Sequence, residues 1–403
     1  MQANENLRKD VDVIINQLLK DINPYDSAVK ALNDIKLNNG RTILISIGKA
    51  AWTMADAVVK TINIDDGTVI TKYNHSKGDI QKCKVFEAGH PIVDENSIKA
   101  TEYALKITEN LNENDNVIFC ISGGGSALFE KPLIELSKLQ DISNQLIKSG
   151  ASINEINAIR KRLSMVKGGR FASHCLPAHI NAIILSDVIG NDLSSIASGP
   201  VAVDTYTNKE VLDIIKKYNI VVDEEVLSIL KNETIKQIDN VDNYVIGSVS
   251  MLCNYTKDIC EKLGYTSQIV SDNCTDNVND IKNIFAELLK ESKHNHAYII
   301  GGESVVEVKG NGLGGRNSHL ALLCSDLLID NDNACIFAFG SDGTDGPTDA
   351  AGGYVDIDTS KIIDVDKYLD NFDSYNGLKK TNGLIITGPT GSNINDVYCL
   401  LVK

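Results

Sequence analysis

The chain has 403 residues, of which 43% are hydrophobic, and a formal net charge of −15 at pH 7. At ~100–200 residues per domain, this length predicts two or three domains, and the apolar content is sufficient for large cores. A chain this acidic repels nucleic acid and anionic membranes as a whole, so any anionic substrate must be bound by a local positive pocket. We therefore expect neither nucleic acid nor membrane among its partners.

Leader, membrane span and disulfide framework are all missing from the sequence. The first residues carry no apolar leader, and no segment reaches ~18 consecutive apolar residues. The nine cysteines are scattered without a CxxC pair. An odd number of cysteines without a framework is typical of a reducing compartment. We expect a soluble, cytoplasmic protein.

The first half of the chain alternates between helical and strand patterns. Apolar residues between Leu7 and Leu19 recur at helical spacing and predict an amphipathic first helix. Apolar runs then predict strands at residues 41–47, 68–71, 83–88, 116–121 and 180–185, with helices between them. Such alternation predicts a parallel, doubly wound, Rossmann-like sheet with ligands at the carboxyl ends of its strands. A polar stretch near residues 232–242 predicts the boundary between domains 1–236 and 237–403.

Lys49 follows the first predicted strand directly, after Gly48. A lysine at a strand-to-helix junction can reach a phosphate bound at the start of the helix. Most lysines are merely solvated, so both interpretations stay open for Lys49.

A glycine-rich loop follows the strand 116–121. It consists of Ser122, Gly123, Gly124, Gly125 and Ser126. Strand, glycine turn and helix start aim backbone N–H groups at an anion, and glycine lets the backbone approach a ligand closely. The loop favours a phosphate or carboxylate cradle over an ordinary tight turn. It is neither a P-loop nor a complete dinucleotide fingerprint, because Leu128 occupies the third glycine position.

A basic run interrupts this acidic chain. It comprises Arg160, Lys161, Arg162, Lys167 and Arg170, and it surrounds a glycine pair. The run is either an anion-facing surface or a solvated helix face.

Carboxylates follow the strand 180–185, at Asp187 and Asp192. Mg²⁺ takes few protein oxygens and keeps waters and substrate phosphates, so acids at a strand end suit it, although aspartate is also an ordinary turn residue. The strand 334–339 ends similarly, in Asp342 and Asp345.

The second half of the chain restarts the alternation of strands and helices. We expect strands at residues 244–249, 268–270, 297–300, 334–339, 384–387 and 397–402, and helices at 251–263, 279–293 and 316–328. Arg316 and Asn317 head the last of these helices, directly after a glycine-rich segment.

These motifs together resemble the glycerate 2-kinase family, in which a glycerate-kinase-like N-terminal domain is joined to a C-terminal MOFRL domain. The resemblance covers nearly the whole chain. It rests on GKAAWTMA (48–55), GHPIVDENS (89–97), SGGGSAL (122–128), NAIRKRLSMVKGGR (157–170), SDVIGNDLSSIASGP (186–200), GLGGRN (312–317), SDGTDGPTDAAGG (341–353) and GPTGSNIND (388–396).

The resemblance implies ATP-dependent phosphorylation of the 2-hydroxyl of D-glycerate, which gives 2-phosphoglycerate and ADP, with Mg²⁺ accompanying the nucleotide. It implies a second α/β domain with a mixed sheet and an active site in the cleft between the domains. The functional lysine and arginine of the family fall on Lys49 and Arg316. Homodimer formation stays open.

Phosphoryl transfer asks a protein mainly for positioning and charge neutralisation. We therefore predict that Arg316 clamps the γ-phosphoryl group, that Lys49 neutralises phosphate or the glycerate carboxylate, and that the glycine-rich loop cradles an anion. Asp187 either orients the 2-hydroxyl as a weak base or holds Mg²⁺. The remaining predicted contacts to substrate, phosphate or metal are Arg160, Lys167, Asn317, Asp345 and Asp192.

The sequence departs from the family pattern at Asn191, where an aspartate is usual, and at Ser318-His319, where Gln-Glu is usual. Two other functions stay open. An NAD(P)H-dependent hydroxypyruvate reductase is disfavoured by the incomplete fingerprint at Leu128. A non-catalytic sensor of small phosphorylated acids would need the glycine-rich loop alone, without Lys49 and Arg316.

Overall fold

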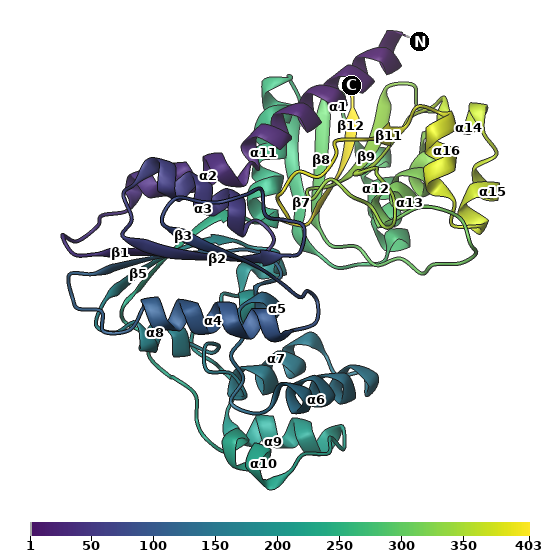
Figure 1. Ribbon diagram of the computed structural model, residues 1–403. Coiled ribbons are helices and arrows are strands. Elements are labelled where there is room, and N and C mark those ends of the chain that lie inside the picture. Colours follow the sequence, from purple (N-terminus) through teal and green to yellow (C-terminus); the bar gives the residue numbers. More distant parts are fainter. Residues whose placement is uncertain (1) are drawn as a thin grey trace. The chain divides into compact units, whose positions relative to one another are not determined.

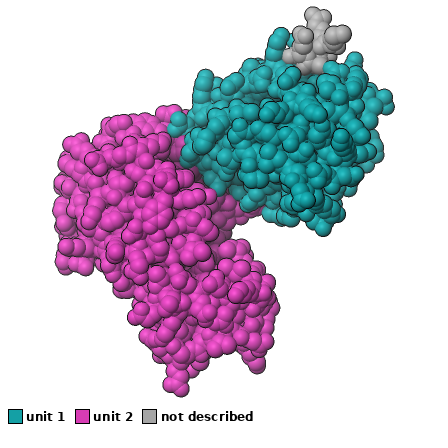
Figure 2. Space-filling model, turned by 45° about the vertical axis from the view of Figure 1, so that its right-hand side comes forward, with its two compact units in different colours: residues 1–23, 247–403 teal, residues 24–246 magenta. Residues whose placement is uncertain are grey.

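A computed structural model describes residues 2–403, with side chains from residue 6 onward. The chain forms two compact units, one of residues 24–246 and one of residues 1–23 with 247–403 (Figure 2). We expected a boundary after residue 236, whereas the contacts divide the chain after residue 246. The difference arises because the strand that we expected to open the second domain, β6 (Val241–Gly247), is the sixth strand of the first sheet.

The unit of residues 24–246 contains a six-stranded sheet of order β3-β2-β1-β4-β5-β6. The pairings among its first five strands are all parallel. This order confirms the predicted Rossmann-like, doubly wound sheet. The other strands are β1 (Thr42–Ile47), β2 (Asp66–Lys72), β3 (Cys83–Ala88), β4 (Asn116–Ile121) and β5 (His179–Leu185).

Helices cover both faces of this sheet, as buried parallel strands require. Figure 1 shows α2 and α3 over one face and α4, α5 and α8 over the other. These helices are α2 (Pro24–Asp34), α3 (Ala51–Thr61), α4 (Glu95–Ile107), α5 (Gly125–Leu128) and α8 (Arg170–His174), and two short 3₁₀ turns, η1 (Ile189–Asn191) and η2 (Ile196–Ser198), follow β5. Every residue of β1 and β4 is buried, which explains their continuous apolar runs.

Four further helices of this unit pack on one another around a core of their own, in which Leu146, Ile159 and Val211 are buried. They are α6 (Leu136–Lys148), α7 (Ile153–Arg162), α9 (Asn208–Lys217) and α10 (Glu224–Leu230). Ser152 and Thr207 form capping boxes at the starts of α7 and α9, which fixes where these helices begin.

The other unit contains a mixed sheet of order β11-β10-β9-β12-β8-β7, as expected. Strands β7 and β8 pair in parallel, and the remaining pairs are antiparallel. Its strands are β7 (Thr266–Cys274), β8 (His296–Gly302), β9 (Ala334–Gly340), β10 (Gly352–Val355), β11 (Leu384–Ile385) and β12 (Asp396–Val402).

In this unit α1 and α11 lie over one face of the sheet, and α12, α13, α15 and α16 lie over the other (Figure 1). The helices are α1 (Gln2–Asp21), α11 (Val249–Lys262), α12 (Val278–Glu291), α13 (Arg316–Leu323), η3 (Cys324–Leu328), α14 (Thr359–Ile362), α15 (Val365–Asp370) and α16 (Ser374–Lys380). The predicted helix 316–328 is therefore an α-helix that continues as a 3₁₀ helix. No described helix is both long and apolar enough to cross a membrane.

Candidate active site

The first part of the candidate site lies at the switch point of the parallel sheet. Chain order reverses between β1 and β4, whose last residues, Ile47 and Ile121, are paired. Ligands of open α/β sheets bind at such a point, beyond the carboxyl ends of the strands. The loops that follow these two strands carry Lys49 and the glycine-rich loop. The structure therefore brings these two predicted features together.

Hydrogen bonds join the two loops. The backbone N–H of Lys49 donates to the carbonyl of Gly123 over 2.9 Å, and that of Ala50 donates to Ser122 Oγ over 3.1 Å. Ser122 Oγ in turn donates to the carbonyl of Ile47 over 3.0 Å. The Ser122 hydroxyl is thus used within the protein, and it fixes the loops rather than facing an anion.

The glycines themselves are required by close approach. Gly124 has φ +89°, in the left-handed region that favours glycine. A β-carbon at Gly123 would lie 2.4 Å from Asp187 Oδ2, and one at Gly124 would lie 3.0 Å from His90 Cδ2. Asp187 and His90 therefore pack directly against the loop. The backbone N–H groups of Gly123 and Gly124 donate to no backbone carbonyl in the described part of the chain. Backbone N–H groups of this kind in a glycine turn can bind an anion.

Lys49 and His90 both lie beside the glycine-rich loop; Lys49 is positively charged and His90 is neutral. The ammonium of half-buried Lys49 forms no ion pair within residues 6–403. Burial first, and then the charges of Lys49 and Lys72, lower the pKa of His90 to about 4, so its imidazole is neutral at pH 7. Sequence reasoning quoted Gly89-His90-Pro91 as part of a family motif but gave His90 no role in the site. The histidine at the carboxyl end of β3 was the signal that it missed.

Asp187 and Asp192, the predicted metal ligands, have different surroundings. Asp187 follows β5 after one residue and lies against Gly123. Asp192 accepts hydrogen bonds from the backbone and hydroxyl of Ser194 and, over 2.6 Å, from Ser195 Oγ. Burial would raise the pKa of Asp192, but these hydrogen bonds lower it. The Asp192 carboxylate thus stabilises its own turn, whereas the Asp187 carboxylate lies against the glycine-rich loop.

Ser126, at the start of α5, shares a hydrogen bond with Ser198, with 2.9 Å between the two Oγ atoms.

The described residues contain no group of three or more His, Cys, Asp or Glu side chains arranged to hold a metal ion. Mg²⁺ bound with a nucleotide needs only one or two carboxylates besides phosphate oxygens and water. Asp187 offers one such carboxylate beside the glycine-rich loop.

The basic run does not form one surface. Lys167 is fully buried, and its ammonium lies 2.8 Å from Glu130 Oε2 and 2.8 Å from the carbonyl oxygen of Phe129. Burial lowers the pKa of Lys167, and Glu130 opposes that shift. Arg160 is half-buried and donates from Nε to Ser143 Oγ over 3.4 Å. The charge of Lys167 is therefore neutralised inside the protein.

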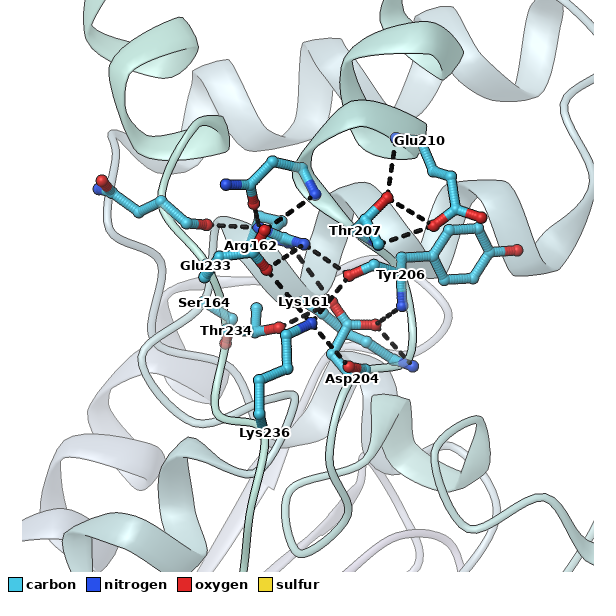
Figure 3. A network of polar contacts seen from close by, with 12 residues as sticks. Lys161, Arg162, Ser164, Asp204, Tyr206, Thr207, Glu210, Glu233, Thr234 and Lys236 are labelled. Atoms are coloured by element: carbon cyan, nitrogen blue, oxygen red, sulfur yellow. Dashed lines mark hydrogen bonds and ion pairs between the residues drawn. The ribbon is translucent and has the colours of Figure 1, made fainter.

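Arg162 and Lys161 also point inward (Figure 3). Asp204 Oδ2 lies 3.4 Å from Arg162 Nε, and Asp204 Oδ1 lies 3.7 Å from Lys161 Nζ, with all three side chains buried. The Arg162 guanidinium also donates to the carbonyls of Tyr206 and Asn232. The segment after residue 231, where we expected the boundary between the domains, is thus anchored to α7.

The remaining predicted site residues lie in the unit with the mixed sheet and surround Arg316, the first residue of α13. Arg316 Nε lies 2.6 Å from Asp396 Oδ2, Nη2 lies 3.3 Å from Asp396 Oδ1, and Nη1 lies 2.7 Å from Glu303 Oε1. Burial alone would lower the pKa of Arg316, but Asp396 and then Glu303 raise it. Sequence reasoning named neither carboxylate. Asp396 is the last residue of the GPTGSNIND motif, and its position at the start of β12 could have identified it.

Asp345 and Asn317 support the start of α13 from within. Asp345 Oδ1 accepts from the backbone N–H of Asn317 over 2.9 Å, and Oδ2 accepts from that of Ser318 over 2.7 Å. Burial raises the pKa of Asp345, and these hydrogen bonds oppose the shift. Asn317 is buried and hydrogen-bonds Asp396. Asp345 thus occupies the anion-binding end of the helix itself.

A cavity of about 350 Å³ adjoins Arg316. Its polar lining includes Arg316, Asp342 and Thr344, and its apolar lining includes Val306, Val308 and Phe372. Such a mixture of apolar walls and a few polar groups is typical of small-molecule sites. The cavity lies entirely within the unit that carries the mixed sheet.

A doubly wound sheet with a glycine-rich loop and a lysine at its switch point defines the class of α/β proteins that bind a ligand beyond the carboxyl ends of their strands. Two family models match the chain. One is described as a domain of unknown function, DUF4147, over residues 10–231, and the other is the MOFRL family, over residues 296–396.

Curated relatives match over nearly the full length. A D-glycerate 2-kinase of Thermotoga maritima is 44% identical over 414 residues, which cover 99% of each chain. A crystal structure of glycerate kinase from the same organism has a TM-score of 0.96 and 43% identity, and covers 99% of this chain and 100% of that one. A protein of Agrobacterium vitis called putative hydroxypyruvate reductase is 31% identical over 90% of this chain and 100% of its own. The chain belongs to the glycerate 2-kinase family.

Proposed function

We propose that this protein transfers the γ-phosphoryl group of ATP to the 2-hydroxyl of D-glycerate, giving 2-phosphoglycerate and ADP. One observation carries the proposal: Lys49, which forms no ion pair with the described side chains, the glycine-rich loop and Asp187 meet at the switch point of the sheet. Relatives named D-glycerate 2-kinase and glycerate kinase support it over the whole chain.

The geometry suits phosphoryl transfer because this reaction depends on positioning and on neutralising the charge of the transferred oxygens. The glycine-rich loop offers backbone donors, and Lys49 offers a positive charge without a protein partner. Arg316 offers a planar guanidinium that can bind phosphoryl oxygens in a fork. We assign the γ-phosphoryl group to Arg316, and phosphate or the glycerate carboxylate to Lys49.

Mg²⁺ would be held by Asp187 together with phosphate oxygens. The fit is chemical: Asp187 is a carboxylate at a rigid strand end that presses against the glycine-rich loop. When bound, the ion neutralises charge on the phosphate oxygens. Orientation of the 2-hydroxyl by Asp187 is the other role that its position allows.

The test is an assay with ATP, Mg²⁺ and D-glycerate in which ³¹P NMR identifies the product. We expect 2-phosphoglycerate and an equal amount of ADP. Formation of 3-phosphoglycerate would move the reacting hydroxyl, and no ADP above a glycerate-free control would contradict the kinase assignment.

Hydroxypyruvate reduction is the second candidate, and the strand order favours it because dinucleotide-binding folds share that order. The loop chemistry opposes it. The first turn reads Gly48-Lys49-Ala50 without the glycine fingerprint, and Leu128 is buried in the core. NADH oxidation with hydroxypyruvate, measured beside ATP consumption, separates the two functions.

We also infer a reducing, cytoplasmic location. All nine cysteines are free, and eight of them are buried. Burial raises the pKa of most of these thiols, for example that of Cys120 to about 12, so they pack as small apolar residues.

A further inference from the structure

Two carboxylates with different surroundings hold the Arg316 guanidinium. The Asp396 side chain is 4% exposed and contacts Nε and Nη2, whereas the Glu303 side chain is 49% exposed and contacts only Nη1. A carboxylate that contacts two nitrogens fixes both the position and the plane of a guanidinium. A single contact from a half-exposed glutamate fixes neither.

Asp396 is itself firmly held. It is the first residue of β12, and its backbone pairs with Gly302 on one side and Gly340 on the other. Tyr398 Oη donates to Asp396 Oδ2 over 3.3 Å and accepts from the backbone N–H of Ser304 over 2.9 Å. The pairing of β12 on both sides and the hydrogen bonds of Tyr398 therefore fix the position of the Asp396 carboxylate.

This arrangement is not explained by stability alone. A buried ion pair recovers little more than the cost of removing its charges from water. Burial raises the pKa of Asp396 to about 6 despite the neighbouring Arg316, so the folded protein bears a cost when this carboxylate ionises. The effect of the ion pair is instead to fix the orientation of the Arg316 guanidinium.

We propose that Asp396 is the positioning residue of Arg316, and that Glu303 occupies Nη1 until the anionic ligand replaces it. Asp396 holds the edge formed by Nε and Nη2, which leaves the edge formed by Nη1 and the second hydrogen of Nη2 to bind phosphoryl oxygens in a fork. The inference deepens the proposed function and rests on it, since it assigns the ligand of Arg316 to the phosphoryl group of the nucleotide.

The first test compares kcat and the KM for ATP in Asp396→Asn and Glu303→Gln. Asparagine keeps the shape but loses the charge and one acceptor for Arg316, so we expect kcat to fall about ten- to a hundredfold with little change in KM. Glu303→Gln removes a competitor of the ligand, so we expect the KM for ATP to fall severalfold. If Asp396→Asn leaves kcat unchanged, or if Glu303→Gln raises the KM, the inference is wrong.

A double-variant cycle shows whether Asp396 acts through Arg316. In an Arg316→Lys background, adding Asp396→Asn should change kcat less than about threefold, because the fork that it aligned is already lost. An equal fold-loss in both backgrounds would mean a general structural role and would overturn the inference. Tyr398→Phe is a milder second variant, expected to lower kcat severalfold at unchanged KM, and it keeps the test valid if Asp396→Asn folds poorly.

NMR of ¹⁵N-arginine-labelled protein gives a readout that needs no activity. The Nε–H signal of Arg316, assigned by its loss in Arg316→Lys, should be slow to exchange in the wild type. It should shift and exchange faster in Asp396→Asn but not in Glu303→Gln. A wild type that shows this signal but transfers no phosphoryl group to glycerate would contradict the proposed function alone. An active wild type whose signal is identical in Asp396→Asn would contradict this inference alone.

Discussion

Lys49 shows how one residue acquires a role from what surrounds it. Thirty-nine lysines and arginines are present, and most lie on the surface or in ion pairs. Lys49 is half-buried at the end of β1, its backbone is bonded to Gly123, and its ammonium has no carboxylate partner among the described side chains. An unpaired charge in this position is available to a ligand.

Lys49→Ala should therefore reduce kcat about a hundredfold or more, because a charge that neutralises the transition state is typically worth about 3 kcal/mol. The fold should persist, since the ammonium makes no ion pair that stabilises it. Steady-state kinetics and far-UV circular dichroism check both statements. Lys99→Ala, at an exposed position of α4, is the control, and near-wild-type activity in Lys49→Ala would remove Lys49 from the mechanism.

Asp187→Asn should reduce turnover at every Mg²⁺ concentration. The amide keeps the shape of the side chain but can neither neutralise a cation nor accept a proton at the end of β5. Titration of Mg²⁺ against rate is the measurement. Full recovery at high Mg²⁺ would show that Asp187 merely strengthens metal binding.

Asp396 predicts a pH dependence of stability. Its pKa in the folded protein is raised to about 6, so between roughly pH 4 and 6 the unfolded chain releases this proton before the folded one does. Stability from this group is therefore present below pH 4, falls as pH rises to about 6 and then stays constant, over a range on the order of 3 kcal/mol. The difference in unfolding free energy between wild type and Asp396→Asn, measured from pH 3.5 to 7, should follow that course. A difference that does not vary with pH would mean that the pKa is not raised.

At the scale of elements, a buried network determines where the helical part of residues 136–236 is attached. Arg162, at the end of α7, contacts Asp204 and the carbonyls of Tyr206 and Asn232, so one guanidinium connects α7 to two other segments, around residues 204–206 and 232 (Figure 3). The basic residues of α7 that the sequence pattern could place on a surface therefore lie partly inside the protein, where Arg162 holds these segments together.

Arg162→Met should destabilise the unit of residues 24–246 by about 3 kcal/mol or more, because it leaves Asp204 buried with a weaker partner. Adding Asp204→Asn should restore part of that loss, since the unpaired charge is then gone. Urea unfolding monitored by hydrogen exchange within α9 measures the effect. Lys236→Ala, which removes a half-exposed lysine of the same network, should cost less than about 1 kcal/mol. Equal losses of unfolding free energy in Arg162→Met and Lys236→Ala would contradict this account.

At the scale of the whole molecule, the position of an element in the sequence does not decide which compact unit it belongs to. α1 is the first helix, yet it packs on α11 and β9 of the unit formed by residues 247–403. Tyr265 Oη and Lys403 Nζ each lie 2.6 Å from Asp10 Oδ2, which attaches the helix to the residue before β7 and to Lys403.

Leu18→Ala should therefore destabilise the unit with the mixed sheet, by about 2–5 kcal/mol for a fully buried leucine. Hydrogen exchange should accelerate in α11 and β9 and stay unchanged in β1 and β4. Val13→Ala, at a position of α1 that is about half exposed, is the matched control. Faster exchange in β1 would show that α1 stabilises the other unit instead.

The sequence by itself determined the parallel sheet, the glycine-rich loop and the family. These features are local: a strand buried on both faces is a continuous apolar run, and a close approach of neighbouring side chains to the backbone of a loop needs glycine. Leu44 and Phe119 belong to such runs, and Gly124 to such an approach, whatever the rest of the chain does. Short elements such as β10 and α14 lack a periodic pattern and were not predicted.

Only the tertiary structure decided which charges are paired inside the protein and which have no partner among the described side chains. Lys49 and Lys167 each lie near glycine in the sequence, but Lys167 is paired with buried Glu130 and Lys49 is unpaired. Arg316 and Asp396 are 80 residues apart and meet because β12 is inserted between β8 and β9. Partners of this kind depend on strand order and burial, and the free energy of a charge depends on its partner and on its distance from water. A linear pattern contains neither quantity.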